Sequence, residues 1–186
     1  MSSTVAKAGR RRVRWLPWLT VFAFIVVLAM NYLAVSLPLA GRTTGEVSSR
    51  FPVSVTPADY AFSIWSVIYL GLAAFTLYQA LPAGAAGRLD RIRLLFLLSC
   101  LFNVAWLVAW HNLLVPLSLL LMLCLLATLV ILYRETRGVR GGATSFWCLR
   151  LPFSIYLGWI SAATLVNVAV FLYDLGPLRS RPLDLA

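Results

Sequence analysis

The sequence predicts an all-α membrane protein, specifically a bundle of five transmembrane helices. Of the 186 residues, 61% are hydrophobic and only 12% are charged, whereas a soluble domain is about half apolar and a quarter charged. Long apolar runs with almost no charge recur five times, and about 20 such residues span the hydrocarbon of a bilayer. The runs lack both the polar face of a soluble helix and the alternation of a β-barrel strand. They therefore predict helices that lie in lipid.

The predicted spans lie roughly at residues 15–39, 58–81, 94–110, 116–133 and 146–173. The first exceeds the apolar segment of about 7–15 residues in a cleaved signal peptide, so we expect a retained helix. The short link HNLLVP predicts that the third and fourth spans are antiparallel neighbours, and Pro116 suits a helix start. The membrane domain would cover residues 15–175, between a basic disordered tail at 1–14 and a short C-terminal tail at 176–186.

The net charge of +10 is explained by membrane topology rather than by nucleic acid. Twelve basic residues lie on one side of the predicted spans: Lys7, Arg10, Arg11, Arg12, Arg14, Arg88, Arg91, Arg93, Arg134, Arg137, Arg140 and Arg150. Four lie on the other side: Arg42, Arg50, Arg179 and Arg181. Basic loops stay in the cytoplasm. We therefore expect a cytoplasmic N-terminus, a C-terminus outside, contact with the lipid bilayer, and no nucleic-acid partner.

The connection between the first two spans, LAGRTTGEVSSRFPVSVTP, is rich in turn-forming residues and long for a link in a compact bundle. Loops of that length are usually functional or disordered. The apolar Phe51 and Val53 favour order, and Thr56 followed by Pro57 suits the start of the next helix. We expect residues 41–57 to fold over the outer end of the bundle as a lid.

The sequence shows no catalytic or metal-binding constellation. Cys100, Cys124 and Cys148 lie in or at the edge of apolar runs, and an odd number in such places argues against a disulfide framework. We interpret them as small buried apolar residues. With one histidine and no clustered acids, no metal site is predicted. No acid–base pair or activated nucleophile is visible either.

Three predicted helices each carry an aromatic stripe with polar residues in it. Because each helical residue advances about 100°, three sets of residues each share a face. The sets are Asn103, Trp106 and Trp110; Tyr156, Trp159, Ala163 and Asn167; and Phe62, Trp65, Tyr69 and Thr76. Lipid offers polar atoms no partners, so we expect the stripes to turn into the bundle.

Two interpretations of the stripes stay open on spacing alone. Asn103 and Asn167 would hydrogen-bond across helices, and Trp110 and His111, at a helix end, would lie in the aromatic belt at the membrane surface. Alternatively, tryptophans placed inside their runs would line an apolar pocket with a few hydrogen-bond donors, the usual composition of a small-molecule site. Trp65, Trp106 and Trp159 are the tryptophans so placed.

Several motifs resemble the TspO/MBR family of tryptophan-rich sensory proteins, related to the mitochondrial translocator protein. TPADYAFSIWSVIYLGL resembles that family's second helix, FNVAW its L-N-x-x-W in the third, and YLGWISAATLVN its Y-x-x-W…A-T-x-x-N in the fifth. The likeness covers residues 15–175, and the motifs recur in the family's order. Two departures indicate a divergent bacterial-type branch. FPVSVTPADY lacks the tryptophan and one proline of the family's W-x-P-P, and Pro152 stands four residues before Tyr156 rather than beside it.

The resemblance implies a five-helix bundle, often dimeric, in the cell (inner) membrane, with a pocket under the first long loop. The family's ligands are porphyrins, haem, sterols and synthetic aromatic drugs, so the expected ligand is a hydrophobic small molecule such as porphyrin or haem, with no covalent cofactor. Eight residues would line the pocket: Trp65, Tyr69, Asn103, Trp106, Tyr156, Trp159, Ala163 and Asn167. Arg42 or Arg50 in the loop would pair with the carboxylates of a tetrapyrrole.

Three functions remain open at this stage. The first is a sensor or regulator that binds tetrapyrroles or related molecules. The second is a transporter of such molecules, although no inverted repeat and no series of intramembrane acids is visible. The third is an enzyme that degrades or photo-oxidises porphyrin, with tryptophan as a redox partner.

Overall fold

The computed structural model describes residues 15–36, 41–53, 55, 59–81, 89–139 and 141–176. Within these residues the chain is helical and contains no strands. The predicted tail at 1–14, the predicted tail at 176–186 apart from Gly176, and the predicted helix start at Thr56 and Pro57 lie outside the described residues.

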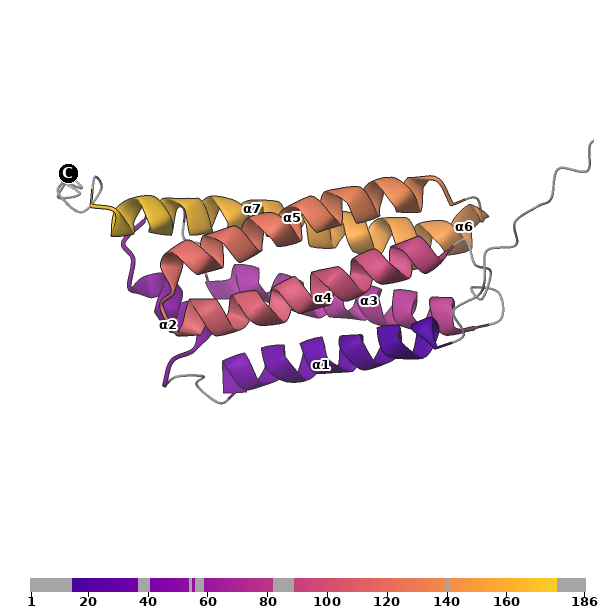
Figure 1. Cartoon of the computed structure of the whole chain (residues 1–186), viewed down its shortest axis with the longest axis horizontal. Coiled ribbons are helices and arrows are strands. Elements are labelled where there is room, and N and C mark those ends of the chain that lie inside the picture. The colour runs from indigo at the N-terminus through magenta and orange to yellow at the C-terminus, as the bar shows by residue number, and fades with distance from the viewer. Residues whose placement is uncertain are drawn as a thin grey trace, which may run out of the picture.

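Five long helices form the body of the protein (Figure 1): α1 (Leu16–Ser36), α3 (Ile64–Ala80), α4 (Asp90–His111), α5 (Val115–Arg137) and α7 (Leu151–Asp174). In the described part of the chain, four short helical segments accompany them: α2 (Thr44–Ser49), the 3₁₀ turn η1 (Asp59–Ser63), α6 (Gly142–Ser145) and the π-helical turn η3 (Phe146–Arg150). As predicted, α4 and α5 are neighbours joined by a short link, and Pro116 lies in the first turn of α5.

The chain is an all-α membrane protein. Among the described residues, four helical segments are long and apolar enough to cross a bilayer: Leu16–Ala34, Asp90–His111, Val115–Arg137 and Gly142–Asp174. The remaining long helix, Ile64–Ala80, is apolar but has 17 residues, which corresponds to about 26 Å of helix. Large apolar side chains such as Leu70 and Leu120 point outward, 75% and 57% exposed, as expected for surfaces that face lipid. Because Ile64–Ala80 is shorter than the other four, the membrane crossing of all five helices stays a prediction.

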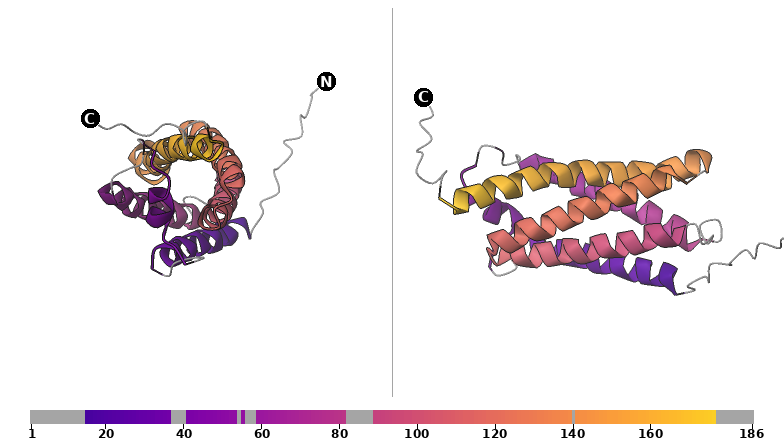
Figure 2. Two further views of the ribbon diagram at one scale, coloured as in Figure 1. Left: turned by 90° about the vertical axis from the view of Figure 1, so that its left-hand side faces the viewer. Right: turned by 45° about the horizontal axis from the view of Figure 1, so that its top comes forward.

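The five long helices form a closed ring. Going round the ring, α1 packs against α4, α4 against α5, α5 against α7, α7 against α3, and α3 against α1. The end-on view in Figure 2 shows this arrangement. The π-helical turn η3 packs on α3 and α5, and α2 packs on α4 at the opposite end of the bundle from α6 (Figure 1). Side chains of α1, α3, α4, α5 and α7 thus meet inside the ring.

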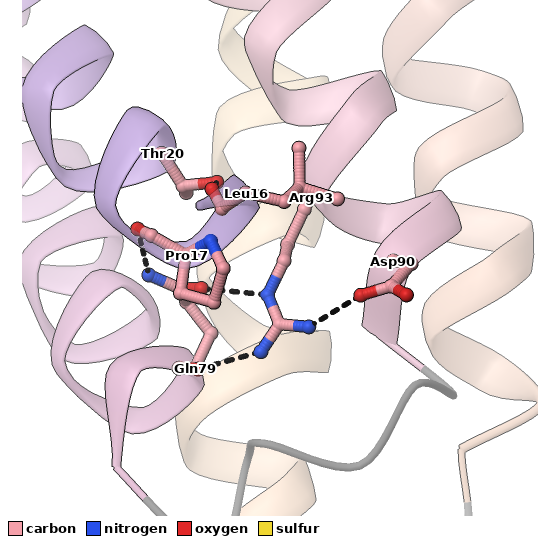
Figure 3. Close-up of polar contacts among 6 residues, drawn as sticks. All are labelled: Leu16, Pro17, Thr20, Gln79, Asp90 and Arg93. Atoms are coloured by element: carbon pink, nitrogen blue, oxygen red, sulfur yellow. Dashed lines mark hydrogen bonds and ion pairs between the residues drawn. The ribbon is translucent and has the colours of Figure 1, made fainter. Parts of the chain in front are cut away.

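A buried arginine explains why α4 begins at Asp90, four residues before the predicted start. Arg93 is 1% exposed, and its Nη1 donates to Asp90 Oδ1 at 2.7 Å. Its Nε donates to Gln79 Oε1 at 2.7 Å and its Nη2 to the Gln79 carbonyl at 2.6 Å. Gln79 Nε2 in turn donates to the carbonyl of Pro17 at 3.1 Å. Figure 3 shows how this cluster, here called the Arg93 clamp, joins α1, α3 and α4.

The start of α7 is arranged around Pro152. Proline cannot donate a backbone hydrogen bond and disturbs the turn before it, and here the preceding turn, Phe146–Arg150, is a π-helix. Prolines and π-helical turns are both places where helices depart from regular α-helical geometry. Pro152 also contacts α3 closely, because a Cβ added at Gly71 would lie 3.0 Å from the Pro152 Cβ. Gly71 therefore permits α3 and α7 to approach.

We predict that Gly71→Ala lowers the free energy of unfolding by about 1–3 kcal/mol, because the added methyl group overpacks against the rigid proline ring. Gly158→Ala is the matched control, since a Cβ there meets nothing within 4 Å. It should raise stability by up to about 1 kcal/mol through helix propensity. Thermal unfolding in detergent measures both. Equal effects of the two substitutions would contradict the close α3–α7 contact.

We also predict that Arg93→Gln lowers the free energy of unfolding by about 3–5 kcal/mol, because it removes a buried guanidinium that bonds Gln79 and pairs with the part-buried carboxylate of Asp90. Arg91→Gln is the control on the same helix. Arg91 pairs with Glu135 at 3.2 Å, but its side chain is 68% exposed, so its loss should cost less than about 1 kcal/mol. Denaturant titration in detergent compares the two. A small effect at position 93 would show that the Arg93 clamp does not stabilise the fold.

Candidate ligand site

Three polar side chains meet inside the ring near its middle. Asn103 of α4 is 1% exposed, and its Oδ1 accepts a hydrogen bond from Asn31 Nδ2 of α1 at 3.0 Å. Asn103 Nδ2 donates to the hydroxyl of Tyr156 of α7 at 3.3 Å. An amide inside an apolar bundle finds its partners on neighbouring helices. This row of hydrogen bonds connects α1, α4 and α7, as the inward-facing stripes predicted.

A second polar group lies closer to α2. The indole N–H of Trp106 donates to Asn167 Oδ1 at 3.1 Å, and the hydroxyl of Ser118 donates to the same oxygen at 3.3 Å. Asn167 Nδ2 donates to the carbonyl of Ala163 at 3.0 Å. A buried indole N–H requires an acceptor, and Asn167 supplies it. Trp106 is thereby held in one orientation by a residue of α7.

The tryptophans of α3, α4 and α7 form a cluster beside these polar groups. Trp65 stacks on Tyr69, with ring centroids 5.4 Å apart, and meets the ring of Trp159 edge to face at 5.9 Å. Trp106 stacks on Trp110 at 5.8 Å. Such pairs add about 0.5–1.5 kcal/mol each beyond the burial of their area. The cluster presents flat aromatic faces to two adjoining cavities.

The first cavity, here called the inner cavity, lies inside the ring. It is lined by Thr44, Ser48, Trp65, Trp106, Trp110, Met122, Trp159, Ile160, Ala163, Val166 and Asn167. The centres of water molecules can occupy about 50 Å³ of it, which is room for a few waters. The tryptophans therefore nearly fill the inner cavity in this conformation.

The second cavity, here called the α1–α3 groove, is larger. It is lined by Leu28, Asn31, Tyr32, Ser36, Thr43, Thr44, Gly45, Trp65, Ser66, Tyr69, Trp106 and Leu107. The centres of water molecules can occupy about 790 Å³ of it, within the range of about 300–1,000 Å³ for small-molecule pockets. Thr44, Trp65 and Trp106 line both cavities, so the two spaces adjoin.

The segment around α2 covers the end of the ring above these cavities. Val47 is fully buried, and the carbonyl of Thr44 accepts a hydrogen bond from the indole N–H of Trp110 at 3.4 Å. The Thr44 hydroxyl lies 3.3 Å from His111 Nε2. The ring of Phe51 meets Trp110 at 6.4 Å and Tyr173 at 6.1 Å. The described part of the loop thus packs on α4 and α7, as the prediction of a lid requires.

Trp110 and His111 correct the sequence interpretation. They were expected in the aromatic belt at the membrane surface, but they are 4% and 0% exposed. His111 Nδ1 donates to the Leu107 carbonyl at 2.8 Å, which leaves Nε2 to face Thr44. The physical reason for the difference is that α2 lies over the end of α4. The end of this helix therefore meets protein rather than lipid headgroups.

A capping box gives α2 its local order. The Thr43 hydroxyl accepts a hydrogen bond from the Glu46 backbone N–H at 3.2 Å, and the Glu46 carboxylate accepts one from the Thr43 N–H at 2.6 Å. These reciprocal bonds satisfy N–H groups that a helix start leaves free. The bond from the Thr43 N–H also holds the pKa of Glu46 below its ordinary value of 4.5. The carboxylate is therefore charged, which suits the N-terminus of a helix.

The structure brings six of the eight predicted pocket residues to the two cavities: Trp65, Tyr69, Trp106, Trp159, Ala163 and Asn167. Asn103 and Tyr156 are buried behind them and line neither cavity. Arg50 lines a different cavity, together with Phe51, Leu113, Val115, Tyr173 and Asp174. Arg42 is half-buried just before α2 and lines none of these spaces.

Sequence reasoning missed several residues of the site, and the polar ones with cross-helix contacts are Asn31, Ser118 and Thr44. Asn31 is an amide within an apolar run, so the rule that singled out Asn103 also applies to it. Ser118 had no comparable signal, because serine is common in membrane helices and usually bonds its own backbone. Thr44 had none either, since it lies in a loop whose position over α4 depends on tertiary packing.

Comparison with known proteins agrees with this geometry. A family model described as TSPO-like protein matches residues 17–179, from α1 to just beyond α7. The chain belongs to the TSPO-like family. The resemblance to TspO/MBR proteins inferred from the helix motifs is thereby confirmed. No curated protein and no solved structure gave a significant match to this TSPO-like protein.

Proposed function

We propose that this TSPO-like protein is a membrane-embedded binding protein that senses or regulates tetrapyrroles, such as porphyrin or haem, or similar hydrophobic molecules. The observation that carries the proposal is the pair of adjoining cavities between the helices, walled by Trp65, Trp106 and Trp159. Indole faces stack on flat rings, and a few fixed polar groups orient them. Asn167 and Asn31 supply such groups beside the aromatic walls.

Binding is favoured over transport and over catalysis by what lines the cavities. No acidic residue is among the described residues that line them, whereas proton-coupled transport uses intramembrane acids. A hydrolytic or acid–base reaction would need a nucleophile with a neighbouring base. Among the catalytic alternatives, the aromatic cluster suits only photo-oxidation, in which tryptophan would act as a redox partner. A sensor needs only a ligand-bound and a ligand-free state that differ in conformation, and it requires neither a nucleophile nor an intramembrane acid.

We further propose that all five long helices cross the inner membrane, with the N-terminus in the cytoplasm, and that the protein acts as a homodimer. The helix Ile64–Ala80 spans with the help of the turn Asp59–Ser63 that precedes it. The described basic residues on the predicted cytoplasmic side, among them Arg91, Arg134 and Arg137, support this orientation.

Mixing the purified protein with protoporphyrin tests the function. Quenching of tryptophan fluorescence without new products, in the dark and under light, is expected for a binding protein. Products that form only under light and only with the protein would instead indicate photo-oxidation. Uptake of porphyrin into vesicles that contain the protein would indicate transport.

Ala163→Leu tests whether the inner cavity belongs to the site. The substitution adds three carbons where Ala163 lines that cavity, so we expect at least a tenfold loss of protoporphyrin affinity, equivalent to about 1.4 kcal/mol. Ala162→Leu is the control, because Ala162 is exposed on the same helix. Fluorescence titration gives the affinity, and thermal unfolding checks that both variants are folded. Normal binding by a folded Ala163→Leu protein would remove Ala163 from the site.

Reporter fusions test the orientation. A fusion after Arg140 should behave as cytoplasmic and one after Arg181 as exported, because basic loops are retained in the cytoplasm. Alkaline phosphatase and green fluorescent protein give opposite readouts for the two sides. The reverse pattern would contradict the proposed topology.

A further inference from the structure

We propose that the α1–α3 groove is the mouth of the ligand site, that it opens sideways to the bilayer, and that it admits the uncharged ring of a membrane-dissolved ligand. This inference rests on the proposed function for the identity of the ligand class. It adds the route of entry and the charge of the part that enters.

Packing along the contact between α1 and α3 changes from one end to the other. At the Arg93 end, Gln79 of α3 bonds the Pro17 carbonyl of α1, and Leu16 and Thr20 are buried. At the α2 end, residues of the same two helices line the groove instead, including Tyr32, which is 69% exposed, and Ser66, which is also exposed. The two helices are thus clamped at one end and separated by a cavity at the other.

The walls of the groove indicate what enters it. They combine the aromatic faces of Trp65, Tyr69 and Trp106 with several neutral polar groups, and none of the described lining residues is charged. The Tyr69 hydroxyl is shielded from solvent and has no hydrogen-bond partner among the described residues. Asn31 uses its Nδ2 toward Asn103 and Val27, and its Oδ1 has no donor among those residues. A neutral ring with one donor and one acceptor matches these groups.

Entry from the bilayer is favoured because α2 obstructs entry from the aqueous end of the ring. The aqueous end of the ring is covered by α2, where Val47 is fully buried and Thr44 bonds Trp110. The inner cavity has room for only a few waters, whereas the adjoining groove holds about 790 Å³. A ligand dissolved in the bilayer therefore meets the groove first. Trp65 and Trp106, which line both spaces, separate it from the inner cavity.

Two substitutions distinguish the bilayer route from entry through the lid. Ser66→Phe fills the groove mouth, and it should slow association of protoporphyrin dimethyl ester from vesicles at least tenfold, measured by stopped-flow tryptophan quenching. Phe51→Ala loosens the lid by removing the contacts to Trp110 and Tyr173, and it should change that rate less than threefold. Leu70→Phe, on an outward-facing residue of the same helix that lines neither cavity, should leave it unchanged.

Faster association in Phe51→Ala together with an unaffected Ser66→Phe would overturn the bilayer route. The charge of the entering part is tested by comparing the dimethyl ester with free protoporphyrin. We expect the ester to bind at least as tightly, because no charged group in the described wall pairs with the carboxylates. If free protoporphyrin binds more than tenfold tighter than the dimethyl ester, the inference that the groove admits an uncharged part of the ligand is wrong.

A labelling experiment tests whether the α1–α3 groove opens to the bilayer, and it does not depend on porphyrin binding. Ser66→Cys is made with Cys100, Cys124 and Cys148 changed to alanine, and the protein in vesicles is treated with neutral N-pyrene maleimide or with a sulfonated, membrane-impermeant maleimide. The neutral reagent should label it at a rate within threefold of Leu70→Cys, and the sulfonated reagent should not. Labelling by the sulfonated reagent, or labelling of Leu70→Cys but not of Ser66→Cys by the neutral reagent, would overturn the inference. Neutral labelling without porphyrin binding would contradict only the proposed tetrapyrrole function.

Discussion

A buried guanidinium fixes one end of this helix bundle, and the shape of the other end follows from it. The Arg93 clamp joins α1, α3 and α4 through Asp90, Gln79 and the Pro17 carbonyl. A buried charge without partners is very costly, so this set of groups holds one geometry. Because the clamp draws α1 against α3 at that end, which Figure 3 shows in close-up, the α1–α3 groove lies in the half of the bundle nearer α2, where residues such as Tyr32 and Thr44 line it.

Inside the ring, threonine hydroxyls and asparagine amides differ in whether they tie helices together. Hydroxyl groups such as those of Thr20, Thr76 and Thr164 donate to carbonyls one turn earlier in their own helix, so they are satisfied without a neighbour. Amides have more groups to satisfy, and Asn103 and Asn167 reach other helices. The amides thus bring side chains of α1, α4, α5 and α7 together beside the tryptophans.

Much of the candidate site was predictable because its residues lie on helices. A fixed angle per residue puts Trp159, Ala163 and Asn167 on one face whatever surrounds the helix, and lipid leaves polar atoms no alternative to the interior. The expectation of an aromatic belt failed for Trp110 and His111, because a helix end in a membrane protein meets either headgroups or another segment. Here the covering segment is α2, whose Thr44 bonds both residues.

The sequence by itself determined the class, the helices and the inward faces, since the hydrocarbon thickness sets the length of apolar runs and helical periodicity sets which residues share a side. It also determined the family, through motifs carried by those faces. Only the tertiary structure decided which helices are neighbours in the ring, that Arg93 is buried rather than a loop charge, and where α1 and α3 separate. These features depend on contacts such as that of Gln79 with Pro17. No local pattern encodes them, because the partners are far apart in the chain.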